Sequence, residues 1–124
     1  MVVYPYNTKF ISLPENCRIA YIDEGKGDRT LLFIHGLANY ALVWKNNIDY
    51  LKQYYRCIAI DLPGNGLSDK NEHDFSMRFF AESVYEFIKA MKLKGPVVIG
   101  HSMGGHIAMT LAIKHPLSLS KLIL

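Results

Sequence analysis

The sequence predicts an α/β fold, in which a mostly parallel sheet carries helices on both faces and begins with an antiparallel hairpin. Three observations support this prediction. Short, continuously apolar segments recur along the 124 residues, which is typical of strands buried on both faces of a parallel sheet. Segments with helical periodicity lie between them, so strands and helices alternate. Neither an internal repeat nor a low-complexity linker divides the chain, and its length suits one domain or part of one.

The first two strands are expected at residues 9–13 (KFISL) and 17–22 (CRIAYI), where apolar and polar side chains alternate. Residues 14–16 between them are turn formers, so the two strands can pair as a hairpin. Cys17 and Cys57 both fall in apolar, strand-like segments. We therefore expect two buried thiols rather than a disulfide or a metal-binding pair.

The next strands are expected at residues 31–34 (LLFI) and 56–60 (RCIAI). Residues 41–54 between them have helical character with a partial apolar face. A parallel pair connected in this way needs a right-handed crossover. The second of these strands leads into residues 61–66 (DLPGNG), a loop rich in turn-forming residues.

The clearest helix is expected over residues 75–93, because apolar side chains recur there at helical spacing. Ser76 can cap its N-terminus, and Phe75 and Phe80 occupy the hydrophobic-staple positions. A strand at residues 97–99 follows.

The last elements expected are a helix at residues 103–114 and a strand at residues 121–124. That final strand is apolar and would lie at an open edge of the sheet. Because such an edge promotes aggregation, we expect these 124 residues alone to be poorly soluble.

The motif that carries chemistry is residues 100–104 (GHSMG), a G-x-S-x-G pattern at a strand-to-helix junction, which is the context that the pattern requires. Backbone segments approach closely around such a turn, and Gly100 and Gly104 have no Cβ to obstruct them. The Ser102 hydroxyl would project from the carboxyl edge of the sheet, where open α/β sheets bind ligands. We therefore predict that Ser102 is a nucleophile.

Two backbone amides are candidates for binding an oxyanion. The Met103 N–H lies at the positive end of the helix that follows the serine. The Leu37 N–H lies in the loop after the strand at residues 31–34, which we expect to be the neighbour of the nucleophile strand. Loss of one such donor typically removes about 3–4 kcal/mol of transition-state stabilisation.

Three segments in this order resemble the α/β-hydrolase fold family: residues 32–36 (LFIHG), 61–68 (DLPGNGLS) and 98–105 (VIGHSMGG). The resemblance covers nearly the whole chain, from about residue 9 to residue 124. Within the family the chain is most similar to cofactor-free esterases, lipases, C–C bond hydrolases and related enzymes. The residues that support the nucleophile and oxyanion motifs are His35, Gly36, Gly100, His101, Gly104 and Gly105.

The resemblance also implies that part of the catalytic machinery lies elsewhere. In the family, an Asp or Glu and then a His follow the serine along the chain, whereas residues 103–124 contain His106 and His115 but no acidic residue. For these two histidines, and for His35, His73 and His101, a structural role is favoured over that of general base. We expect residues 1–124 to be the N-terminal portion of a single domain, with the C-terminal half and the cap that shapes the substrate pocket absent. These residues alone are therefore expected to be essentially inactive.

The reaction implied is hydrolysis of a carboxylic ester or related small-molecule acyl compound, without a metal or cofactor. Haloalkane dehalogenases and epoxide hydrolases of this fold use an aspartate nucleophile, and a serine fits acyl transfer better. Alternatives are a C–C bond hydrolase, thioesterase, acyltransferase or perhydrolase with the same triad, a non-catalytic small-molecule receptor, or an inactive fragment. The sequence specifies neither the substrate nor an oligomeric state.

Other function classes are disfavoured. The net charge of +3 and pI of about 8.8 do not indicate nucleic-acid binding, because basic and acidic residues are interspersed. No apolar run approaches the roughly 20 residues of a membrane helix, and residues 1–12 lack the apolar core of a secretory signal. We expect a cytoplasmic protein. Asp61 is interpreted as shaping its loop rather than as catalytic, and Trp44 as part of the core.

Overall fold

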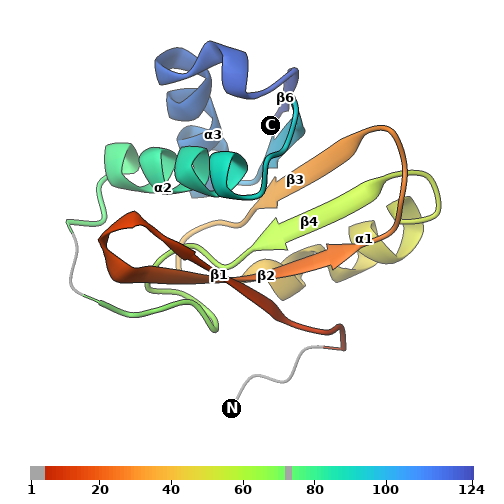
Figure 1. Ribbon diagram of the computed structural model, residues 1–124, viewed down its shortest axis with the longest axis horizontal. Coiled ribbons are helices and arrows are strands. Elements are labelled where there is room, and N and C mark those ends of the chain that lie inside the picture. The colour runs from red at the N-terminus through yellow and green to blue at the C-terminus, as the bar shows by residue number, and fades with distance from the viewer. Residues whose placement is uncertain (1–4, 72–73) are drawn as a thin grey trace.

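A six-stranded sheet with the order β1-β2-β4-β3-β5-β6 organises residues 5–71 and 74–124, the part of the chain that the computed structural model describes (Figure 1). His73 and residues 1–4, interpreted above from sequence alone, lie outside the described residues. The strands are β1 (Lys9–Leu13), β2 (Cys17–Glu24), β3 (Thr30–Ile34), β4 (Arg56–Ile60), β5 (Val97–Gly100) and β6 (Lys121–Ile123). The α-helices are α1 (Lys45–Leu51), α2 (Met77–Ala90) and α3 (Met103–Lys114), and short 3-10 helices are η1 (Pro14–Asn16), η2 (Ala41–Trp44) and η3 (Pro116–Ser118).

Strand pairing confirms the predicted fold class. β1 and β2 form the antiparallel hairpin, and β2 also pairs antiparallel with β4. β3 pairs parallel with both β4 and β5, and β5 pairs parallel with β6. The strand that precedes Leu37 is therefore the direct neighbour of the strand that precedes Ser102, as expected from the sequence. Because parallel strands end at a common edge, the loops after β3, β4 and β5 start side by side.

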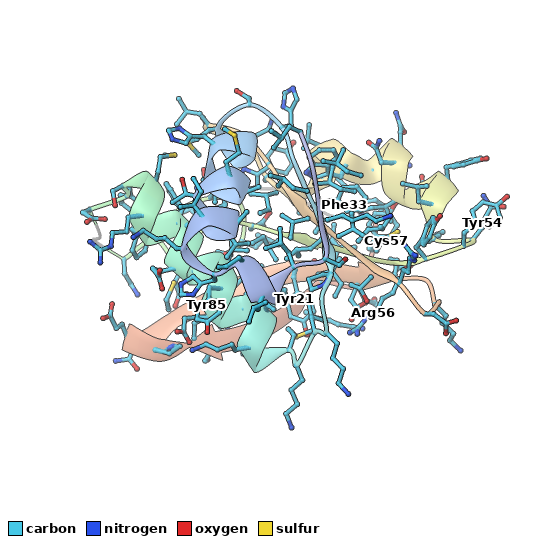
Figure 2. All side chains as sticks on the ribbon, turned by 90° about the horizontal axis from the view of Figure 1, so that it is seen from above. Tyr21, Phe33, Tyr54, Arg56, Cys57 and Tyr85 are labelled. Atoms are coloured by element: carbon cyan, nitrogen blue, oxygen red, sulfur yellow. The ribbon has the colours of Figure 1, made fainter. Side chains whose placement is uncertain are left out.

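Helices cover both faces of the sheet: α2 and α3 lie on one face, and η2 and α1 lie on the other (Figure 1). Successive residues of the inner strands enter opposite cores, so Leu32 packs toward α2 and α3 whereas Phe33 packs toward α1. In the view of Figure 2, Phe33 and Cys57 lie toward α1, and Tyr85 lies beside α2 and α3. Burial on both faces explains why these strands are continuously apolar in sequence.

The start of α2 agrees with the sequence analysis in detail. The Ser76 hydroxyl accepts a hydrogen bond from the Phe79 N–H at 3.0 Å, which makes Ser76 the N-cap. The rings of Phe75 and Phe80 lie with their centroids 5.8 Å apart, in the predicted staple. Capping and stapling together determine where this helix begins.

The segment predicted as helical over residues 41–54 is divided instead. The 3-10 helix η2 comes first, and α1 begins at Lys45 and already ends at Leu51. A tertiary hydrogen bond accounts for the irregular start, because the Ala41 N–H donates to the side chain of Asp61. Periodicity alone does not reveal that contact, and 3-10 geometry is common at helix ends.

Both cysteines are buried and free, as expected. Burial raises the pKa of both thiols, that of Cys57 to about 11, so they are held as neutral, unreactive groups.

The edge of the sheet formed by β6 lies beside exposed apolar side chains. The outer side of α3 and η3 exposes Ile113 (81%) and Leu117 (97%). None of the described helices has the length and apolar character needed to cross a membrane.

We expect Ser76→Ala to lower the free energy of unfolding by about 1 kcal/mol, because the Phe79 amide loses its capping partner. Ser83→Ala in the same helix is the matched control. The Ser83 hydroxyl donates to the Phe79 carbonyl inside the helix, and alanine has the higher helix propensity there. Urea unfolding of both variants measures the effect, and equal losses would contradict the capping assignment.

Candidate active site

Three loops meet at the carboxyl edge of the sheet. Ile34 lies opposite Ile60 on one side and Gly100 on the other. The residues that begin the three loops are His35, Asp61 and His101. A parallel sheet thus brings together segments that are far apart in sequence, at the edge where such sheets bind ligands.

Ser102 occupies a strained turn between β5 and α3. Its backbone has φ 58° and ψ −121°, a conformation that residues other than glycine rarely adopt and that clusters at functional sites. Ser102 is the N-cap residue of α3, but its hydroxyl makes no capping hydrogen bond. The side chain is exposed, and nothing else in the described part of the chain is hydrogen-bonded to it. The hydroxyl is therefore available to an incoming group.

Two glycines permit this turn by allowing backbone segments to touch. A Cβ on Gly100 would lie 2.6 Å from the carbonyl carbon of Gly104. A Cβ on Gly104 would lie 2.5 Å from the His35 carbonyl oxygen and would also collide with the carbonyl group of Ile34. All of these obstacles are backbone atoms, which cannot move aside as a flexible side chain can. The first turn of α3 therefore packs directly against the ends of β3 and β5.

Both amides singled out from the sequence are unpaired among the described residues. The Met103 N–H begins α3 and so has no partner within the helix. The Leu37 N–H makes no hydrogen bond to another described residue, and the Leu37 side chain is 77% exposed. A Cβ on Gly36 would lie 3.4 Å from the Ser102 Cβ, so the loop of residues 36–40 runs directly beside the serine.

His35 is fully buried and binds backbone groups through both ring nitrogens. The Leu62 N–H donates to Nε2 at 3.0 Å, which requires Nε2 to be unprotonated. Nδ1 then carries the hydrogen and donates to the Gly36 carbonyl oxygen at 2.8 Å. Burial lowers the pKa of His35, and the bond to Gly36 and the charge of Asp61 oppose this effect only in part. His35 is a neutral connection between two loops, with neither nitrogen free to deprotonate Ser102.

Asp61 is also fully buried and accepts hydrogen bonds from backbone amides. Its Oδ1 accepts from the Ala41 N–H at 2.7 Å, and its Oδ2 accepts from the Leu67 N–H at 2.8 Å. Gly66 has φ 54° and wraps around this carboxylate, where a Cβ would lie 2.7 Å from Oδ1. The Ser68 hydroxyl donates to the Asp61 carbonyl oxygen at 2.6 Å. These contacts agree with the expectation that Asp61 shapes its loop.

The rings of His101 and Trp44 are in contact beside the serine turn. The His101 ring is exposed and meets the Trp44 ring edge-on, with centroids 6.5 Å apart. Trp44 also packs against Phe33, with centroids 5.0 Å apart, and joins the core under η2 and α1, as expected. Its Nε1 is buried and has no hydrogen-bond partner among the described residues.

A shallow hollow of about 420 Å³ opens beside Ser102, between α3 and the end of β6. His106 lines it. Met109 and Leu124 line it too, and sequence reasoning missed both. Met109 could have been found, because it lies seven positions after Ser102 and two helical turns place both on one side of α3. Leu124 gives no comparable signal.

His115, at the end of α3, lies away from Ser102. The His115 Nε2 lies 2.8 Å from the Glu82 carboxylate, and its ring stacks on Tyr85 at 3.5 Å. His115 thus joins the end of α3 to α2. No three His, Cys, Asp or Glu side chains of residues 5–71 and 74–124 gather as a metal site would require.

Comparison with known proteins matches residues 29–124 to the family model for the alpha/beta hydrolase fold. Epoxide hydrolase 2 of Caenorhabditis elegans is 29% identical over 96% of this chain and 34% of its own length. The acetyltransferase component of the acetoin cleaving system of Cupriavidus necator is 35% identical over 82% of this chain and 27% of its own length. The solved structure of a membrane phospholipase A, described as a bacterial virulence factor, superposes with a TM-score of 0.88, at 33% identity over 94% of this chain and 38% of that one. The chain thus spans about a third of the length of these curated relatives.

We expect Gly104→Ala to lower the free energy of unfolding by about 3 kcal/mol, because the new methyl group collides with the backbone of Ile34 and His35. Gly105→Ala is the matched control. Its Cβ would meet the Gly100 oxygen and a Leu124 methyl at an ordinary 3.5 Å, and alanine gains about 1 kcal/mol of helix propensity. Denaturant unfolding should place Gly105→Ala near or above the wild type. Similar losses in both variants would refute the close packing assigned to Gly104.

Acidification should destabilise the protein through His35. Burial holds the pKa of His35 below its ordinary value of 6.5 in the folded state, so the unfolded chain binds the proton more readily. The stability due to neutral His35 is complete above pH 6.5 and is lost as the pH falls toward the folded-state pKa.

Urea unfolding at pH 7, 6 and 5 measures this loss. The stability advantage of wild type over His35→Gln should shrink as the pH falls, since glutamine does not titrate. His106→Gln, which replaces an exposed histidine on α3, is the matched control. A constant advantage of wild type over His35→Gln across this range would be inconsistent with a neutral, buried His35.

Proposed function

Because this chain belongs to the alpha/beta hydrolase fold family, we propose that the protein is a serine hydrolase that cleaves a carboxylic ester or related acyl substrate. The observation that carries the proposal is the free, exposed Ser102 hydroxyl on a strained turn at φ 58°. Two unpaired amides, of Leu37 and Met103, belong to the backbone segments that adjoin it. This is the arrangement that acyl transfer requires: a nucleophile with nearby donors for a developing negative charge.

In the proposed reaction, the Ser102 oxygen attacks the carbonyl carbon and the carbonyl oxygen becomes an oxyanion. The Met103 and Leu37 N–H groups donate to that oxyanion, and the positive end of α3 favours its charge. Expulsion of the alcohol leaves an acyl group on Ser102, which water then releases. A general base accepts the serine proton and returns it to the departing alcohol. This base, and the acidic residue that orients it, are proposed to come from sequence outside these 124 residues.

The likeness to an epoxide hydrolase does not extend the proposal to epoxides. Attack of a serine on an epoxide carbon would form an ether, which such a site cannot hydrolyse. Attack of a carboxylate forms an ester, which water can cleave. Turnover of epoxides therefore needs a carboxylate where this chain has Ser102, whereas acyl substrates suit a serine.

Acyl transfer to an acceptor other than water is a second candidate, and the likeness to an acetyltransferase component favours it. The same acyl-enzyme on Ser102 would form, and a thiol or alcohol would then accept the acyl group. A panel of esters, thioesters and β-diketones, each assayed with and without an added thiol, separates hydrolysis, thioester cleavage, C–C bond cleavage and transfer. A receptor would bind ligands without any turnover, and Ser102→Ala would leave that binding intact.

A fluorophosphonate probe should form one covalent adduct, on Ser102, in the protein isolated at its native length. Activation of the hydroxyl by the site is the reason, since ordinary serines do not react. Mass spectrometry of the digested protein locates the adduct. Ser102→Ala should abolish labelling, and Ser118→Ala, at a serine on η3, should preserve it. Absence of an adduct on Ser102 in the wild-type protein would overturn the proposed function.

A further inference from the structure

We propose that Asp61 is a positioning residue for the chemistry of Ser102. This proposal rests on the proposed function and deepens it. Together with the backbone of Leu62, Asp61 fixes both ends of the loop of residues 36–40 and so directs the Leu37 N–H toward the oxyanion. Asp61 does not touch the substrate and acts through this loop.

The two anchors come from consecutive residues at the end of β4. The Leu62 N–H donates to His35, which in turn donates to the Gly36 carbonyl oxygen, and this fixes the start of the loop. Asp61 Oδ1 accepts from the Ala41 N–H at 2.7 Å, and this fixes the residue that follows the loop. Both side chains in this connection, His35 and Asp61, are completely buried.

Between the anchors, residues 37 and 38 have little support of their own, whereas Tyr40 packs against the core beside η2 and α1 and donates its N–H to the Asn39 side chain. Leu37 and Ala38 are exposed, and their backbone amides make no hydrogen bond to another described residue. Ala38 has φ 55°, in the left-handed region that alanine seldom adopts. The residues that flank Leu37 and Ala38 therefore determine the path of the loop, because these two are exposed and make no hydrogen bond to the rest of the described chain.

The first anchor also determines the direction of the proposed donor. The Gly36 carbonyl and the Leu37 N–H belong to one trans peptide unit, in which the two groups point in opposite directions. His35 holds the carbonyl from the protein interior, so the Leu37 N–H points the other way. Displacement of Ala41 would change the direction of the Leu37 N–H, because only residues 37–40 lie between Gly36 and Ala41.

A carboxylate at position 61 is required because both of its oxygens accept hydrogen bonds. Oδ1 faces the Ala41 N–H and Oδ2 faces the Leu67 N–H. An asparagine has the same shape but would turn an NH₂ group toward one of these donors. In Asp61→Asn the side-chain NH₂ group would therefore face a backbone N–H group, two donors with no acceptor between them. The variant should loosen the loop without a change in side-chain volume.

The test measures the rate at which a fluorophosphonate phosphonylates Ser102, as kinact and KI, in Asp61→Asn at the native chain length. Phosphonylation places a developing P–O⁻ on the same donors as an ester oxyanion. We expect kinact to fall about 10- to 100-fold with KI unchanged, less than the roughly 10²–10³-fold effect of deleting a donor outright. The final extent of labelling should equal that of wild type, which separates a slower site from a partly unfolded sample.

Asp69→Asn is the matched control. Asp69 also accepts a hydrogen bond from a backbone amide, that of Arg18 at 2.9 Å, and it lies on the same β4 loop. It makes no contact with residues 36–41 among the hydrogen bonds and ion pairs of the described residues. Its kinact should stay within twofold of wild type even if its melting temperature falls.

Ala41→Pro provides a second route if Asp61→Asn does not fold. Proline replaces the Ala41 N–H with a ring Cδ that lies against Asp61 Oδ1, so it breaks this anchor from the side of the loop. The first position of η2 favours proline, and Tyr40 before it is already extended at φ −163° and ψ 173°. Met77→Pro, at the first position of α2, is its control. A fall in kinact for Ala41→Pro and not for Met77→Pro supports the anchor.

The outcomes separate the two proposals. If wild type labels on Ser102 and both Asp61→Asn and Ala41→Pro keep a wild-type kinact, the positioning role is wrong and the proposed function stands. An equal fall in Asp61→Asn and Asp69→Asn would also overturn it, because the effect would then belong to the β4 loop in general. If wild type forms no adduct on Ser102, both proposals fail.

Discussion

The structure depends on the close approach of backbone to backbone where α3 begins. The first turn of this helix lies against the carbonyl groups that end β3, and its Gly104 carbonyl lies against Gly100 of β5. No side chain fits between these segments, which is why two glycines flank Ser102 at a spacing of two residues. This contact forces the serine into a strained conformation and exposes its hydroxyl. It also brings the loop after β3 beside the serine, so the same backbone contact positions the nucleophile and the candidate oxyanion donors.

A buried polar network provides the second level of organisation. His35, Asp61 and Ser68 have almost no solvent exposure, and each is hydrogen-bonded to backbone. His35 binds the Leu62 N–H and Asp61 binds the Ala41 N–H, whereas Ser68 binds the Ala20 N–H of β2 and the Asp61 carbonyl oxygen. A buried polar group is costly unless it is hydrogen-bonded, so these residues tolerate few alternative arrangements. The network fixes the β3 and β4 loops to each other, whereas the glycine contact fixes the β3 loop to α3. The outer side of α3 and the edge strand β6, by contrast, expose apolar side chains.

Sequence reasoning succeeded where the cause is local and failed where it is tertiary. Continuous apolar segments located the inner strands, and the Ser76 cap and phenylalanine staple located the start of α2. The pattern around Ser102 predicted a strand-to-helix turn because glycine spacing is a local steric requirement. The irregular start of η2 depends on Asp61, twenty residues away, and the wrapping of Gly66 around that carboxylate has no periodic signature. The hollow beside Ser102 includes Leu124, which only the pairing of β5 with β6 brings there.

The most direct test of the central claim is a crystal structure of the protein at its native length with a boronic acid bound, because a boronate imitates the tetrahedral intermediate of acyl transfer. The account predicts a covalent bond between boron and the Ser102 Oγ. One boronate oxygen should then lie about 2.7–3.1 Å from both the Leu37 and the Met103 backbone nitrogens. A boronate bound elsewhere, or bound to Ser102 with its oxygens directed away from these two amides, would contradict the account.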